Sequence, residues 1–112
     1  SARHGLKENL QIMPEAVNYA RALGEALSTL DGVRVNPETP QVAMFHLHFA
    51  LKANELSEKI TDYASNTGVV LLPLPRAEIN DEAICEVSIG RNAMSQPQSF
   101  WLRHFKAFLE TL

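Results

Sequence analysis

The segment Met44–Leu51 constrains the fold more than any other part of the sequence. Its apolar residues occupy every second position, namely Phe45, Leu47, Phe49 and Leu51. Successive side chains of a strand point to opposite faces, so this alternation predicts a strand with one apolar and one more polar face. Because an apolar sheet face must be covered, the chain needs further strands and a layer of helices packed against them.

Three segments carry apolar side chains at the three- and four-residue spacing of amphipathic helices. They are Met13–Leu30, Glu55–Thr67 and a C-terminal segment that opens at Ser95. Ser95 and Gln98 have the pattern of a capping box, and Asn54 is expected to cap the second helix. These helices supply the layer that the sheet requires.

Two glycines have specific roles in this interpretation. Gly24 lies within the first helix, where glycine costs about 1 kcal/mol relative to alanine, so we expect a close approach to a neighbouring segment. Gly68 follows the second helix and is expected to end it in the left-handed conformation.

Three more segments are predicted to be strands: Val33–Asn36, Val69–Leu72 and Ala83–Ile89. The polar, proline-containing stretch 73–82 is expected to be a loop, and Gly90–Met94 a turn. The order α-β-β-α-β-β-α predicts an α+β fold, with three helices on one face of a small four-stranded, mixed or antiparallel sheet. Residues 1–112 are expected to form a single domain.

The strand periods also predict which side chains are buried and which are polar. The expected core contains Phe45, Leu47, Phe49, Cys85, Val87 and Ile89, packed against Leu23, Leu27, Trp101, Phe105 and Phe108. The opposite, polar sheet face is expected to present His46, His48, Glu86 and Ser88. This face either contacts water or faces another domain or a second copy of the chain.

Composition excludes several classes of function. Lys and Arg total 10 and Asp and Glu total 13, so the net charge of 10 − 13 = −3 offers no basic field for nucleic acid. No apolar run is long enough to span a membrane, and no segment has the form of a signal peptide. The single cysteine, Cys85, excludes an internal disulfide and fits a reducing compartment, so a cytoplasmic location is expected.

The residues that could carry chemistry do not form a self-sufficient catalytic site. His46 and His48 could bind zinc with Glu86 as a third ligand. However, no Cys or His follows at a usual metal-ligand spacing, and His4 and His104 lie near the two ends of the chain. A role for His46 and His48 in a polar interface is therefore favoured over zinc binding. The phase of Cys85 favours an inert buried thiol. Arg76 and Arg91 lie in loops that flank the fourth strand, where a solvated arginine is more common than a carboxylate clamp. Neither a catalytic residue nor a metal site is therefore predicted.

Several stretches together resemble one enzyme family. They are Met13-Pro14-Glu15, Ala20–Leu27, Leu30–Val35, Pro40-Gln41, Met44–Phe49, Thr67-Gly68-Val69 and Cys85–Gly90. In this order they are similar to the C-terminal small domain of the threonine aldolase / β-eliminating lyase family. The resemblance covers nearly the whole chain and implies the aspartate aminotransferase fold of pyridoxal-phosphate enzymes.

The resemblance implies that a larger domain, absent from this sequence, carries pyridoxal phosphate and the Schiff-base lysine. Lys7, Lys52, Lys59 and Lys106 are expected to be solvated, so this chain alone should bind no cofactor and catalyse no reaction. Aldolases of the family commonly place a substrate-carboxylate arginine at the start of the last strand. Here that stretch is Ile84-Cys85-Glu86, and Arg76 is the nearest candidate substitute.

Two functions remain open on the sequence. The first is the small domain of a pyridoxal-phosphate-dependent lyase or aldolase that acts on a small amino acid, with the missing large domain as its partner. The alternative is a free-standing α+β interaction module that self-associates as a homodimer.

Overall fold

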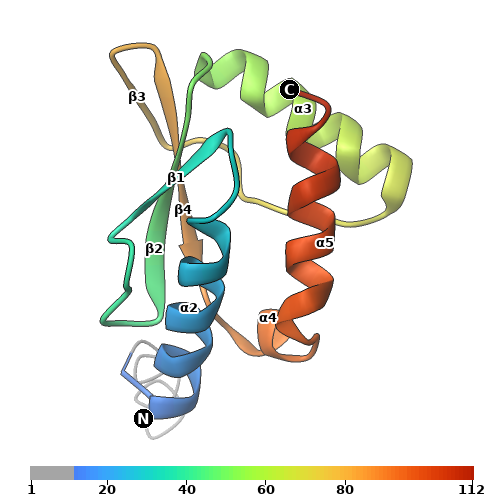
Figure 1. The fold of residues 1–112 in the computed structure, drawn as a ribbon. Coiled ribbons are helices and arrows are strands. Elements are labelled where there is room, and N and C mark those ends of the chain that lie inside the picture. The colour runs from blue at the N-terminus through green and yellow to red at the C-terminus, as the bar shows by residue number, and fades with distance from the viewer. Residues whose placement is uncertain (1–11) are drawn as a thin grey trace, which may run out of the picture.

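A computed structural model describes residues 12–112 and shows one four-stranded sheet (Figure 1). The strands are β1 (Val33–Asn36), β2 (Met44–Phe49), β3 (Ala77–Ile79) and β4 (Glu82–Ser88). Their order across the sheet is β1-β2-β4-β3, and every neighbouring pair is antiparallel. The predicted α+β class is confirmed, and the sheet is antiparallel throughout. Predictions for residues 1–11, including the solvated Lys7, lie outside the described residues.

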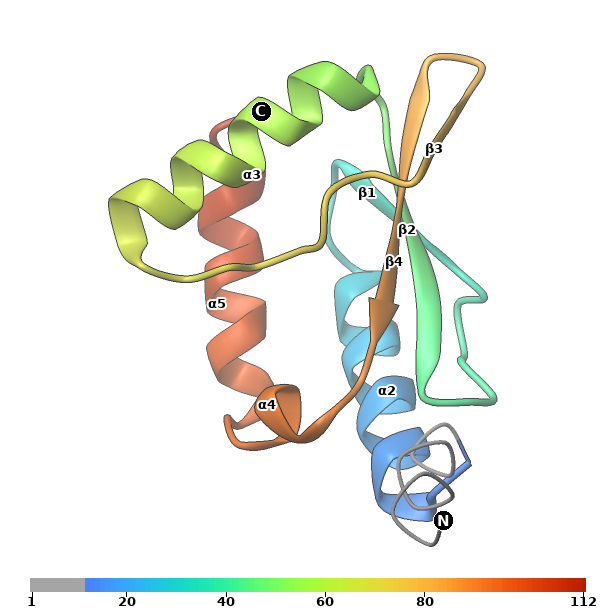
Figure 2. The same cartoon turned by 180° about the vertical axis from the view of Figure 1, so that it is seen from behind.

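Helices cover one face of this sheet (Figures 1 and 2). They are α2 (Pro14–Leu27), α3 (Ala53–Thr67), the one-turn α4 (Arg91–Met94) and α5 (Gln98–Leu109). The described residues thus contain four helices rather than three, because the predicted turn after β4 contains α4. None of the described helices has the length and hydropathy needed to cross a membrane.

The core lies between the helices and the apolar face of β2 and β4. Leu47 is paired with Cys85 and Phe45 with Val87, so the apolar positions of the two strands share one face. Leu47, Phe45 and Cys85 are fully buried, as the period of two predicts. Val87 and Trp101 are only half-buried, in contrast to the prediction, because helices leave this part of the sheet partly open.

Gly24 makes the close approach that the sequence predicts. A Cβ atom added at Gly24 would lie 2.9 Å from both Cγ and Cδ of Pro40. The α2 helix therefore packs directly on the loop between β1 and β2, and Arg21 Nε donates a hydrogen bond to the Pro40 carbonyl at 3.4 Å. This contact places α2 against the edge of the sheet that is opposite β3.

The prediction of a strand at Val69–Leu72 is wrong. Leu71 and Leu72 are buried, but the segment joins no ladder, and β3 forms instead within the stretch predicted to be a loop. The β3 strand forms because of the turn between β3 and β4, where Asn80 and Asp81 have φ angles of 54° and 62°. Two successive positive φ angles are typical of the two-residue hairpin turn that matches strand twist.

Both predicted helix caps are wrong: a side chain distant in sequence accepts from the first amide of α3, and no side-chain hydrogen bond caps the start of α5. The α3 helix begins at Ala53, whose N–H donates to Glu78 Oε1 at 2.7 Å, so Asn54 is already inside the helix. The α5 helix begins only at Gln98, and the Ser95 hydroxyl, which follows α4, donates instead to the Asn92 carbonyl within α4. The predicted left-handed end of α3 is confirmed, because Gly68 has a φ angle of 76°.

Candidate functional site

The sheet face opposite the helices carries the polar side chains of three strands. In the ladder His46 is opposite Glu86, and His48 is opposite both Arg34 and Ile84. The burial pattern of β2 alternates along its whole length, with the histidines at the half-exposed positions. The structure therefore places His46, His48, Glu86 and Ser88 on one face, together with Arg34 and Glu82.

Arg34, His48 and Glu82 form one contact group, here called the Glu82 cluster. Arg34 Nη2 donates to Glu82 Oε1 at 2.8 Å, and His48 Nδ1 lies 3.3 Å from the same oxygen. Arg34 Nη2 also lies 3.1 Å from His48 Nδ1. The hydrogen bond from Arg34 is the main reason that the pKa of Glu82 is below its ordinary value, with a smaller contribution from His48.

Arg76, His46 and Glu86 form a second group, the Glu86 cluster. Glu86 Oε1 accepts a hydrogen bond from Arg76 Nη1 and lies 3.4 Å from His46 Nε2. The Arg76 side chain is 59 % exposed, so the pair is in contact with solvent. Ser88 lies beyond this cluster, exposed and opposite Met44 at the end of β4.

The two clusters limit the chemistry of the polar face. His46 contacts Glu86, whereas His48 contacts Glu82, so the two histidines do not share one carboxylate. Across residues 12–112, no three His, Cys, Asp or Glu side chains are grouped as a metal site requires. Each carboxylate of the two clusters is instead paired with an arginine. The face is thus suited to contact with another polar surface.

Cys85 lies in β4 on the apolar face of the sheet, opposite the polar face, and is fully buried among apolar side chains. Desolvation by this burial raises the pKa of the Cys85 thiol to about 12. The thiolate is the nucleophilic form of cysteine, so Cys85 is protonated and unreactive near neutral pH in the folded chain.

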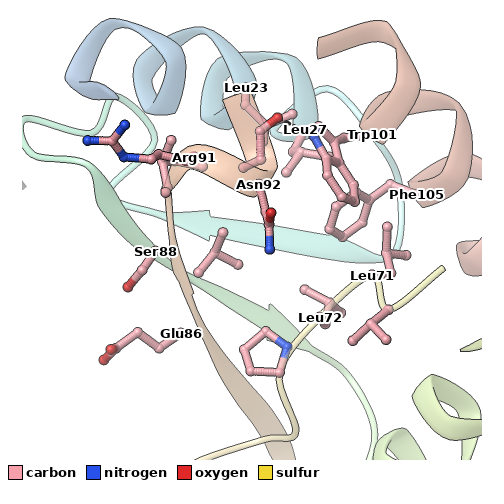
Figure 3. Close-up of a pocket in the computed structure, with 16 residues that line it drawn as sticks. Leu23, Leu27, Leu71, Leu72, Glu86, Ser88, Arg91, Asn92, Trp101 and Phe105 are labelled. Carbon is pink, nitrogen blue, oxygen red and sulfur yellow. Dashed lines mark hydrogen bonds between the residues drawn. The ribbon is translucent and has the colours of Figure 1, made fainter. Parts of the chain in front are cut away.

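One concave feature is a cleft that the sequence analysis did not predict. It has a volume of about 850 Å³ and lies between the end of β4, α4, α5 and the segment 70–73. Leu71, Leu72, Trp101 and Phe105 form apolar walls, and the Asn92 side chain enters from above (Figure 3). The sequence signal that could have indicated this cleft is Val69–Leu72, an apolar segment with the composition of a strand. In the structure this segment pairs with no strand.

The charged residues at the cleft point away from its interior. In Figure 3 the side chains of Glu86 and Arg91 extend to the side of β4 opposite Trp101. Arg91 is exposed at the start of α4, whereas Arg76 is held in the Glu86 cluster. The two arginines singled out in the sequence are therefore not brought together, and neither points into the cleft.

Comparison with known proteins gives matches among solved structures only. No protein-family profile matches the chain, and no curated protein matches it. A protein from Listeria monocytogenes EGD-E, described as an L-allo-threonine aldolase, has 29% sequence identity and a TM-score of 0.70. The match covers 87% of this chain and 27% of the Listeria chain.

A protein from Exiguobacterium sp. 255-15, described as an aromatic amino acid β-eliminating lyase/threonine aldolase, has 27% identity and a TM-score of 0.72. Here the match covers 89% of this chain and 28% of the other. The chain thus spans little more than a quarter of the length of these two enzymes. The resemblance predicted from the sequence is confirmed: in fold and sequence, this chain is similar to one part of threonine aldolase and β-eliminating lyase chains.

Proposed function

We propose that this chain is the small, C-terminal domain of a pyridoxal-phosphate-dependent lyase or aldolase that acts on a small amino acid. The observation that supports this most directly is the asymmetry of the structural matches. Nearly nine-tenths of this chain aligns with little more than a quarter of each enzyme. The remaining part of such an enzyme would be a larger domain, which is the proposed partner of this chain.

Among residues 12–112, no lysine is placed as the Schiff-base lysine of pyridoxal phosphate would need to be. The cofactor supplies an electron sink for bond cleavage at an amino acid, and it needs a lysine beside a phosphate-binding cradle. Lys52 and Lys106 are exposed, and Lys59 is half-buried on the outside of α3. None of these described lysines lines the cleft. The lysine and the cradle are therefore proposed to belong to the larger domain.

The polar sheet face is the proposed contribution of this chain to the active-site region. Arg76 is the candidate contact for a substrate carboxylate, since a guanidinium binds a carboxylate with two parallel hydrogen bonds. Its present partner, Glu86, stands in the stretch where the family commonly has arginine, so a substrate would compete with Glu86 for Arg76. In the intact enzyme, we expect Arg76→Gln to raise KM for the amino acid by about tenfold or more. An unchanged KM would remove Arg76 from the site.

Reduction with borohydride tests whether the lysine that binds pyridoxal phosphate belongs to the larger domain. The 112-residue chain is incubated with pyridoxal phosphate, reduced and digested, and the same is done with the longer polypeptide encoded by its reading frame. We expect the longer polypeptide to retain cofactor on one lysine, and the 112-residue chain to show no single modified site. Stoichiometric labelling of one lysine in the short chain would contradict the proposal. A reading frame with no larger domain, encoding a chain that sediments as a dimer, would favour the alternative of a self-associating module.

A further inference from the structure

The outer edge of β4 is covered over only half of its length. On its inner side, the N–H groups of Ala83 and Ile89 donate to Leu51 and Ala43, at 3.0 and 2.9 Å. On its outer side, the Ile84 carbonyl accepts from Arg76 N–H at 2.9 Å. The direction of backbone hydrogen bonds alternates along a strand. The N–H and C=O groups of odd-numbered residues of β4 therefore point toward β2, and those of even-numbered residues point outward.

This alternation leaves two residues with open backbone groups. The β3 strand pairs only with residues 82–84, so the outward N–H and C=O groups of Glu86 and Ser88 have no ladder partner among the described residues. An open strand edge of this kind is a template for the addition of another strand. We call Glu86–Ser88 the free edge of β4.

The free edge forms one wall of the cleft, and the cleft interior has the chemistry of a peptide-binding groove. Its other walls are apolar, and the charged side chains of Glu86 and Arg91 point away from it (Figure 3). The indole Nε1–H of Trp101 already donates to the Ala93 carbonyl at 3.0 Å, so this side-chain donor is not free for an occupant. The Asn92 amide, which points into the cleft, can donate and accept as a peptide group does.

The wall opposite the free edge also requires a cover. The segment 70–74 joins no ladder, and its Val70 and Leu74 side chains are 73% and 59% exposed. Apolar side chains at this degree of exposure beside an apolar cleft are typical of a surface that another polypeptide covers. A strand placed in the cleft would lie between the free edge of β4 and this segment.

The position of α4 indicates where such a strand would come from. Tyr19 of α2 places its hydroxyl 2.9 Å from the carbonyl of Ala93 in α4, and Met13 lies beside Arg91 and Met94 in a shallow surface groove. The start of α2 therefore lies next to α4, and α4 lines one end of the cleft. About three quarters of each enzyme in the structural matches lies outside the aligned part.

We infer that the free edge of β4 and the adjoining cleft receive an extended segment of the larger domain, which adds to the sheet as a strand beside Glu86–Ser88. This inference rests on the proposed function and names the surface through which the two domains associate. The inserted segment pairs with the backbone of Glu86 and Ser88 and places an apolar side chain against Trp101 and Phe105.

Hydrogen exchange at individual amides tests the inference. In the 112-residue chain, the amides of Glu86 and Ser88 should exchange rapidly, whereas the Val87 amide, which faces β2, should be protected. In the longer polypeptide, we expect exchange of the Glu86 and Ser88 amides to slow by about 100-fold or more, with Val87 protected in both. Rapid exchange at Glu86 and Ser88 in a longer polypeptide that retains pyridoxal phosphate would overturn the inference and leave the proposed function intact.

A pair of variants at Ser88 provides the matched control. Ser88→Pro removes the outward N–H, which no described residue uses, and Ser88→Ala keeps it. In the longer polypeptide, Ser88→Pro should abolish the protection of the Glu86 amide, and Ser88→Ala should preserve it. If Ser88→Pro fails to fold, the exchange of the unmodified chains still decides the question. Protection of Glu86 and Ser88 that grows with the concentration of the 112-residue chain would identify a second copy as the occupant and overturn the assignment to the larger domain.

Discussion

Leu47 lies at the centre of the sheet, fully buried and opposite Cys85. Truncation of a buried leucine removes its contacts and leaves a cavity that a rigid core only partly closes. We expect Leu47→Ala to lower the free energy of unfolding by about 2–5 kcal/mol in urea titrations. Ser88→Ala, at an exposed position of β4, should stay within about 0.5 kcal/mol of the unmodified chain. A loss below about 1 kcal/mol at Leu47 would mean that this site tolerates the cavity.

Glu82 shows how the polar face responds to pH. Its pKa is lowered mainly by the hydrogen bond from Arg34, so the ionised carboxylate is favoured in the folded chain. The stabilisation is present above the unfolded pKa and is lost as pH falls through the lower, folded pKa. In Arg34→Gln, NMR titration should show the Glu82 pKa rising toward its ordinary value, and the stability difference from the unmodified chain should shrink at acidic pH. Lys106→Gln, at an exposed position of α5, should leave the Glu82 titration unchanged.

At the scale of elements, α2 depends on a position where no side chain fits. Alanine at Gly24 gains about 1 kcal/mol of helix propensity, but its Cβ would meet the Pro40 ring at 2.9 Å. Because the ring is rigid, overpacking should outweigh the gain, and we expect Gly24→Ala to cost about 1–3 kcal/mol in thermal or urea unfolding. Asn18→Ala, at an exposed position of the same helix, should be neutral or slightly stabilising. A stabilised Gly24→Ala variant would show that α2 can move away from the loop.

At the scale of the whole molecule, the described residues share one core. Buried side chains from α2, α3, α5, β1, β2 and β4 belong to a single contact cluster. We therefore expect one cooperative unfolding transition, with coincident curves from far-UV circular dichroism and from the fluorescence of Trp101, the single tryptophan of the chain. Two separate transitions would mean that part of the helical layer unfolds independently of the sheet.

Features that depend on the pattern within one segment were predictable from the sequence. The buried face of β2, the three long helices, the close approach at Gly24 and the left-handed end of α3 at Gly68 all agree with the structure. Each follows from the spacing of apolar residues or from a residue that suits one backbone conformation, and neither property depends on which distant segment lies alongside.

Only the tertiary structure decided the features that need a partner from elsewhere in the chain. Val69–Leu72 has strand-like residues but no neighbour to pair with, whereas Ala77–Ile79 is a strand because the Asn80-Asp81 turn brings it beside β4. The first amide of α3 is satisfied by Glu78, 25 residues away, and the polar residues of the sheet divide into two arginine–carboxylate clusters. The edge of β4 that lines the cleft is open because β3 pairs only with residues 82–84. Hydrogen bonds between distant backbones and side chains decide these features, and their partners become neighbours only when the chain has folded.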